Sequence, residues 1–152
     1  MLREKFKEML KEAMKARKER ATGTLRLITA ALKDRDIAAR GRGKMDGIDE
    51  AEILSMLQTM IKQRKESIQH FEQGGRLELA QQEQEEIEII EGFLPKQMSD
   101  AEAETAIKDL IAEIGAGSIK DMGRTMAALR ERYAGRMDFT KASAAVKQAL
   151  GK

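Results

Sequence analysis

The chain has 152 residues, with 28 Lys or Arg, 26 Asp or Glu, 3% aromatic residues, one Pro and no Cys. This length corresponds to one compact domain or two small ones and excludes a large multidomain enzyme, and the missing Cys excludes disulfides, thiolate zinc sites and thiol nucleophiles. Because Val and aromatic residues are scarce while Met, Ala, Leu, Glu, Lys and Arg dominate, the composition predicts an all-α protein.

Charge is distributed unevenly along the chain. Counting Lys and Arg against Asp and Glu gives +8 for residues 1–44, −10 for residues 45–104 and +4 for residues 105–152. Two interpretations are open: the basic ends contact the phosphates of a nucleic acid, or they fold against the acidic middle. No apolar run approaches the roughly 18 residues of a membrane span, and the basic start lacks the apolar stretch of a signal peptide. We therefore expect a cytoplasmic protein without membrane contact.

The first two helices are predicted from apolar residues at helical spacing. The first begins at Leu2 and ends near Thr22-Gly23, and the second begins at about Thr24. The second helix is expected to dissolve over residues 38–44, because two glycines there lower helix propensity. This segment, which holds Arg40, Arg42 and Lys44, predicts a flexible basic loop.

A third and a fourth helix form a predicted hairpin. Asp49 followed by Glu52 resembles a capping box and begins the third helix, which Gly74-Gly75 ends. The fourth helix runs from Arg76 to about residue 93. About four helices therefore make up the first half of the chain.

A domain boundary is predicted at Leu94-Pro95, because Pro disfavours helix at the preceding residue. A second capping box, Ser99 with Glu102, starts a fifth helix, and two further helices follow with caps at Ser118 and Asp138. We predict an N-terminal helical domain over residues 1–95 and a small C-terminal three-helix bundle over residues 96–152.

Two charged residues interrupt the apolar stripes of the third and fourth helices, where an unpaired charge is costly. If these helices form a hairpin about Gly74-Gly75, positions whose numbers sum to about 150 face each other, which pairs Ser67 with Glu83 and Arg64 with Glu86. The cluster is interpreted as a structural hydrogen-bonded network. A ligand pocket is the alternative.

The sequence offers little catalytic chemistry. With His70 as the one histidine, neither a Ser-His-Asp set nor a pair of Glu-x-x-His motifs can form. The five acids between residues 83 and 91 are typical of a solvated helix face. No Walker-type phosphate loop is present. We expect no metal site, no cofactor and no catalysis by the chain alone.

Several segments together resemble one protein family. They are Leu25-Arg26-Leu27-Ile28, Ala30-Ala31-Leu32-Lys33, Gln63-Arg64-Lys65-Glu66-Ser67-Ile68, Gly75-Arg76 with Leu79-Ala80 and Glu83, Phe93-Leu94-Pro95, Lys120-Asp121-Met122-Gly123, Met126, Gly135-Arg136-Met137-Asp138 and Val146-Lys147 to Leu150. Together these segments resemble the GatB/YqeY family, in its small stand-alone YqeY branch. The resemblance covers nearly the whole chain.

This resemblance implies two helical domains and a link to tRNA. In the larger relatives, the B subunits of tRNA-dependent amidotransferases, a similar helical tail contacts tRNA while a separate body forms the amide. That body, which carries the carbon-nitrogen ligase activity with glutamine as nitrogen donor, is absent here. The resemblance therefore implies an accessory role without autonomous catalysis.

We expect the chain to bind tRNA or another structured RNA through backbone phosphates, chiefly on the C-terminal bundle. The predicted RNA-binding residues are the basic residues of this bundle and of the basic loop, namely Lys120, Arg124, Arg130, Arg132, Arg136, Lys147, Arg40, Arg42 and Lys44. The alternative is a protein-interaction module that docks on a larger partner such as an amidotransferase or a synthetase.

Overall fold

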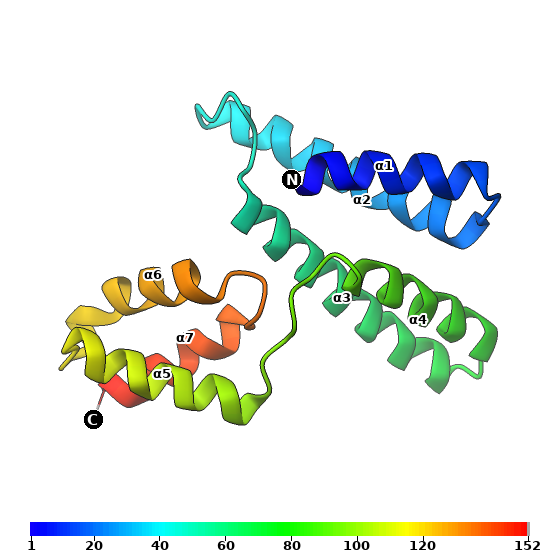
Figure 1. The fold of residues 1–152 in the computed structure, drawn as a ribbon. Coiled ribbons are helices and arrows are strands. Elements are labelled where there is room, and N and C mark those ends of the chain that lie inside the picture. Colours follow the sequence, from blue (N-terminus) through cyan, green and yellow to red (C-terminus); the bar gives the residue numbers. More distant parts are fainter. Residues whose placement is uncertain (152) are drawn as a thin grey trace. The chain divides into compact units, whose positions relative to one another are not determined.

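The computed structural model describes residues 1–151, and within that range every regular element is a helix (Figure 1). This confirms the predicted all-α class. In chain order the elements are α1 (Leu2–Lys15), α2 (Glu19–Gly41), α3 (Glu50–Gln73), α4 (Leu77–Glu91), α5 (Asp100–Ile114), the short 3-10 helix η1 (Ile119–Asp121), α6 (Met122–Tyr133) and α7 (Phe139–Leu150). In residues 1–151 no helix combines the length and the apolar character needed to cross a membrane.

The helices form two compact units, Met1–Leu94 and Pro95–Lys152. In the first unit α1 pairs with α2 and α3 pairs with α4 as helical hairpins (Figure 1). Phe6 of α1 meets Phe93, which follows α4, edge to face with ring centroids 4.9 Å apart. Both ends of the unit therefore close the same apolar core. Its most deeply buried side chains include Phe6, Leu25, Ile28, Ile53, Met56, Leu57, Ile87 and Ile90.

The second unit is a bundle of three short helices with a core of its own. Ile107 and Leu110 of α5 pack with Leu129 of α6 and Val146 of α7. The predicted caps are confirmed at the starts of α3, α5 and α7. In each, the side chain of the capping residue accepts a hydrogen bond from a backbone N–H of the first turn, as Asp49, Ser99 and Asp138 do.

The break between the first two helices lies elsewhere than predicted. α1 already ends at Lys15 and α2 begins at Glu19, because Arg17 adopts a left-handed backbone with φ 54° that a right-handed helix cannot continue. Gly23, the expected stop, lies inside α2. A Cβ at this position would meet nothing beyond its own helical turn within 4 Å. The packing of this unit therefore does not require glycine there.

The basic loop is shorter than predicted and is tied down at its end, because α2 continues to Gly41. Arg3 donates two hydrogen bonds to the Asp36 carboxylate, at 2.6 and 2.8 Å, and a third to the carbonyl of Ile48 at 2.7 Å. The Ile48 N–H in turn donates to Asp36 at 3.0 Å. The Arg3 guanidinium holds the pKa of Asp36 at about 2, below its ordinary 3.8. This clamp joins α1, α2 and the end of the loop.

Asp36→Asn removes the charge that Arg3 neutralises, so we expect the free energy of unfolding to fall by about 1–2 kcal/mol at neutral pH. The pKa of Asp36 is lower in the folded than in the unfolded chain, so this stabilisation is complete above about pH 4 and is lost as the pH falls through about 2. Urea unfolding of both proteins across this range measures the difference. A difference that stays constant down to about pH 2 would contradict the clamp.

Gly23→Ala is expected to stabilise the protein by about 0.5–1 kcal/mol, because alanine has the higher helix propensity and finds open space here. Thermal or urea unfolding measures the gain. The matched control is Gly47→Ala, which should destabilise the protein because Gly47 has φ 86° and its Cβ would collide with the Asp36 carboxylate. Loss of stability in Gly23→Ala would mean that the site is crowded after all.

Candidate nucleic-acid interface

Two of the predicted RNA-binding arginines of the second unit are neutralised by neighbouring acids. Arg132 of α6 makes two hydrogen bonds to the Glu113 carboxylate of α5, at 2.6 and 2.8 Å. Arg124 lies 3.2 Å from the Asp121 carboxylate and donates to the carbonyl of Ile114 at 3.0 Å, where it caps the end of α5. These arginines therefore link α6 to α5, and their charges are compensated within the fold.

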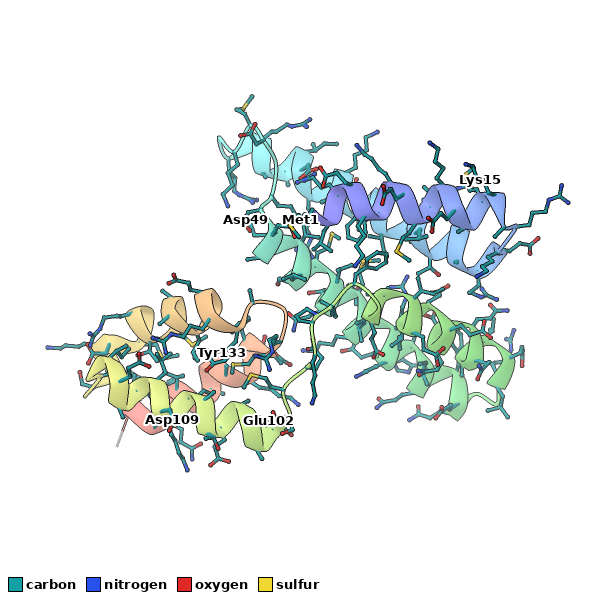
Figure 2. All side chains as sticks on the ribbon, in the orientation of Figure 1. Met1, Lys15, Asp49, Glu102, Asp109 and Tyr133 are labelled. Atoms are coloured by element: carbon teal, nitrogen blue, oxygen red, sulfur yellow. The ribbon has the colours of Figure 1, made fainter. Side chains whose placement is uncertain are left out.

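Arg136 is held by neutral groups. Its Nε donates to the carbonyl of Lys96 at 3.0 Å, and its guanidinium lies 6.0 Å from the ring centroid of Tyr133, which is labelled in Figure 2. The backbone N–H of Met98 donates in turn to the carbonyl of Arg136 at 2.9 Å. Arg136 thus fastens the segment before α5 to the turn between α6 and α7.

Other cations of the second unit have no acidic partner among residues 1–151. Lys120 on η1 and Lys147 on α7 are exposed, and their side chains make no hydrogen bond or ion pair in this range. Arg130 lies 6.0 Å from the ring centroid of Phe139, a contact that leaves its charge uncompensated. Sequence reasoning missed Lys141, an exposed and unpaired lysine on α7.

These unpaired cations lie on elements that contact one another, since η1 and α6 both pack against α7. The helix α7 contains Lys141 and Lys147 and no Asp or Glu between residues 139 and 150. The missing acid was the available sequence signal for Lys141. We name Lys120, Lys141 and Lys147 the lysine set. They are the cations of η1 and α7 that the described fold leaves to solvent.

The three predicted residues at the end of α2 differ in the same way. Lys44 forms an ion pair with Glu52 at 2.9 Å. Arg40, on the last turn of α2, and Arg42, just after it, are exposed and have no ion pair within residues 1–151. These residues belong to the first unit, whereas the lysine set belongs to the second.

The polar cluster of the first unit joins α3 to α4. Arg64 donates to Glu86 at 2.8 Å and to the carbonyl of Met60 at 3.2 Å, and its Nε lies 3.8 Å from Glu83. The three charged side chains are between 13% and 23% exposed, so two carboxylates share one guanidinium in a partly dry site. Burial, and then the charge of Glu86, raise the pKa of Glu83 above its ordinary value.

Ser67 does not join this cluster as predicted. Its hydroxyl donates to the carbonyl of Gln63 one turn earlier, at 3.2 Å. This local bond costs less ordering than a reach across the hairpin, and the long Arg64 side chain contacts Glu83 in its place. The cluster therefore resembles a register-fixing ion network more than a ligand pocket.

A groove of the first unit is open to solvent. It has a volume of about 490 Å³, lies between the start of α2 and α4 and is lined by Lys18, Glu19, Arg20, Ala21, Glu85, Glu88 and Ile89. The carboxylates that line it face solvent, so they lack the desolvation that general acid or base catalysis requires. His70 is exposed. No group of three or more His, Cys, Asp or Glu among residues 1–151 is arranged to hold a metal ion.

Glu83→Gln and Glu86→Gln should have opposite effects on stability at neutral pH. Because the pKa of Glu83 is raised in the folded state, its charged form is disfavoured there, so Glu83→Gln should be neutral or stabilising by up to about 1 kcal/mol. Glu86→Gln should destabilise by about 1–3 kcal/mol, because Arg64 loses its closest charged acceptor. Denaturant unfolding measures both.

Lowering the pH supplies the control for this pair. As the pH falls through the raised pKa of Glu83, its carboxyl becomes protonated in the wild type and the gain from Glu83→Gln should vanish. A gain that persists at acidic pH, or destabilisation by both variants alike, would show that Glu83 is a stabilising charge.

Comparisons with known proteins give relatives named "Altered inheritance of mitochondria protein 41, mitochondrial". The relative from Lachancea thermotolerans is 32% identical over 111 residues, which cover 72% of this chain and 57% of that protein. The relative from Vanderwaltozyma polyspora is 29% identical over 123 residues, covering 77% and 64%. The relative from Saccharomyces cerevisiae strain YJM789 is 34% identical over 85 residues, covering 56% and 44%. The matched region thus covers between 44% and 64% of each relative.

The predicted cytoplasmic location is contradicted by these relatives, which are named as mitochondrial proteins. Composition alone could not have shown this, because the amino-acid content of a folded domain does not specify the compartment in which it works.

The family comparison covers more of the chain. A family model described as "Yqey-like protein" matches residues 3–150. With nearly its whole length matched in this way, the chain belongs to the YqeY-like family.

Proposed function

We propose that this YqeY-like protein is an accessory factor without catalysis of its own, which binds structured RNA, and tRNA in particular, through phosphates. The observation that carries the proposal is the sorting of cations in the second unit. Arg124 and Arg132 are neutralised by acids, whereas the lysine set faces solvent without partners among residues 1–151. Contacts with phosphates need cations whose charge is not already compensated by a neighbouring acid.

The chemistry of this surface favours the RNA backbone over its bases. Lysine presents a mobile point charge, which suits phosphates whose positions vary. The aromatic rings nearby, Tyr133 and Phe139, are half-buried and lie against Arg136 and Arg130, so they are poorly placed to stack on bases. Recognition should then follow the shape of the RNA, which fits a folded molecule such as tRNA.

The resemblance to the GatB/YqeY family supports tRNA as the partner, because the B subunits of tRNA-dependent amidotransferases carry a similar helical tail that contacts tRNA. In this proposal any amide-forming or other bond-making chemistry belongs to a companion enzyme. The acids that line the open groove face solvent, and the partly buried Glu83 and Glu86 are held by Arg64 in the ion network that joins α3 to α4. The accessory role would be to hold or present the RNA.

The test is a titration of tRNA with the full chain at two salt concentrations. Replacing Lys120, Lys141 and Lys147 by Gln should weaken binding about tenfold or more at low salt. It should also flatten the salt dependence, because about three fewer counterions are released.

The matched control removes the same charge from the first unit, by replacing Lys11, Lys62 and Lys65, which are also exposed and make no ion pair within residues 1–151, with Gln. This control should change affinity less than threefold or so. Equal losses of tRNA affinity in both triple variants would show that binding depends only on the net charge of the protein. No measurable tRNA affinity of the wild type would refute the proposed function.

A further inference from the structure

The outer face of α2 carries a regular pattern of residues that are exposed to solvent. On the side opposite the buried Leu25, Ile28 and Leu32, residues follow one another at alternating spacings of four and three. We name this line the α2 seam; it consists of Gly23, Leu27, Ala30, Asp34, Ile37 and Gly41. Leu27 is 48% exposed and Ile37 is 54% exposed. This spacing is that of the a and d positions through which helices pack in coiled coils.

A line of cations runs along one edge of the α2 seam. Arg26, Lys33 and Arg40 recur at intervals of seven residues, which places them about 10.5 Å apart along the helix axis. In heptad terms they occupy the position that borders the seam and selects a partner by charge. None of the three side chains makes a hydrogen bond or an ion pair with another residue in the range 1–151. The opposite edge, at Ala31 and Ala38, is uncharged.

Gly23 supplies an independent observation. Glycine in the interior of α2 lowers helix stability, and nothing in the unit occupies the space that a Cβ would need. A helix that approached the seam closely would account for glycine at this place, because small residues allow two backbones to come near each other. The seam thus has open space at Gly23 and apolar anchors at Leu27 and Ile37.

We propose that the α2 seam docks an amphipathic helix of a partner protein that carries acidic residues along one edge. Leu27 and Ile37 would pack against its apolar stripe, and Arg26, Lys33 and Arg40 would face its acids. Asp34 interrupts the apolar line, and a polar residue at such a position fixes the register of a helix pair. The partner helix therefore carries Lys or Arg opposite Asp34.

The charge pattern of the α2 seam favours an acidic partner helix over RNA and over a second copy of this chain. RNA would use the three cations but would gain nothing from Leu27 and Ile37. A second copy of the seam would present another basic edge, with Asp34 in the apolar line as its one acid. The inference concerns the first unit and stands apart from the proposed RNA contact of the second, so either can fail alone.

The test uses two synthetic peptides of about 21 residues, three heptads long. Both have Leu along the stripe and one Lys placed to face Asp34, and they differ only in an edge of Glu or an edge of Lys. Fluorescence anisotropy with the full chain should show that the Glu-edged peptide binds about tenfold or more tightly than the Lys-edged one. The triple variant Arg26→Glu, Lys33→Glu, Arg40→Glu should invert this preference.

Two further variants make the result specific. Leu27→Ser with Ile37→Ser should weaken both peptides, and it should leave the fold intact because these side chains are already exposed. Reversing the charges of Lys7, Lys11 and Lys15 on α1, which are exposed as well, should leave the preference unchanged.

Three results would overturn the proposal. The first is equal binding of both peptides, or binding of neither. The second is loss of tRNA binding on reversal of the α2 cations without any peptide preference, which would assign the face to RNA. The third is a dimer in sedimentation that the Leu27 and Ile37 variant abolishes, which would assign the seam to a second copy.

Discussion

Burial of a single apolar face per helix is the interaction on which both units rest. With 36% of its residues charged, the chain can offer only one such face on most of its helices, and helices of 12 to 24 residues gain most of their stability from packing. The first unit gathers these faces around Phe6, Leu57 and Ile90, and the second around Leu110 and Leu129. The other faces of the helices form ion pairs or are exposed to solvent. The lysine set and the α2 seam belong to these exposed faces.

The fate of each cation follows from its side chain and its neighbours. Arginines make the directed contacts that hold elements together, as Arg3 does with Asp36, Arg64 with Glu86 and Arg132 with Glu113, because a planar guanidinium can bind a carboxylate in fixed geometry. The lysine set has no such partner in the described range. Local charge counts treat these two groups alike. In the second unit the structure separates Arg124 and Arg132, which are paired with acids, from the lysine set, which is not.

Features that depend on a few neighbouring residues could be predicted from the sequence. The caps at Asp49, Ser99 and Asp138 are of this kind, because a cap is completed within one helical turn. The contact of Arg64 with Glu86 follows from the position of the hairpin turn. The break after α1 could not be predicted in the same way, since it rests on a left-handed arginine and not on a glycine.

Features that depend on residues far apart in the sequence could not be predicted from it. Nothing near Arg132 or Arg136 in the sequence marks Glu113 or the Lys96 carbonyl as their partners, so paired and unpaired cations were predicted alike as RNA contacts. The α2 seam was hidden for a related reason. Leu25 and Leu27 are equally apolar, and only the packing of α2 shows that the first is buried and the second exposed.

RNA bound as proposed would cover the amines of the lysine set. Lysine acetylation of the full chain, read residue by residue with and without tRNA, measures this directly, since an amine against a phosphate is shielded from the reagent. We expect tRNA to protect Lys120, Lys141 and Lys147, while Lys62, Lys65 and Lys108 react as before. Protection of the second group to the same degree, or of neither, would contradict the proposed RNA contact.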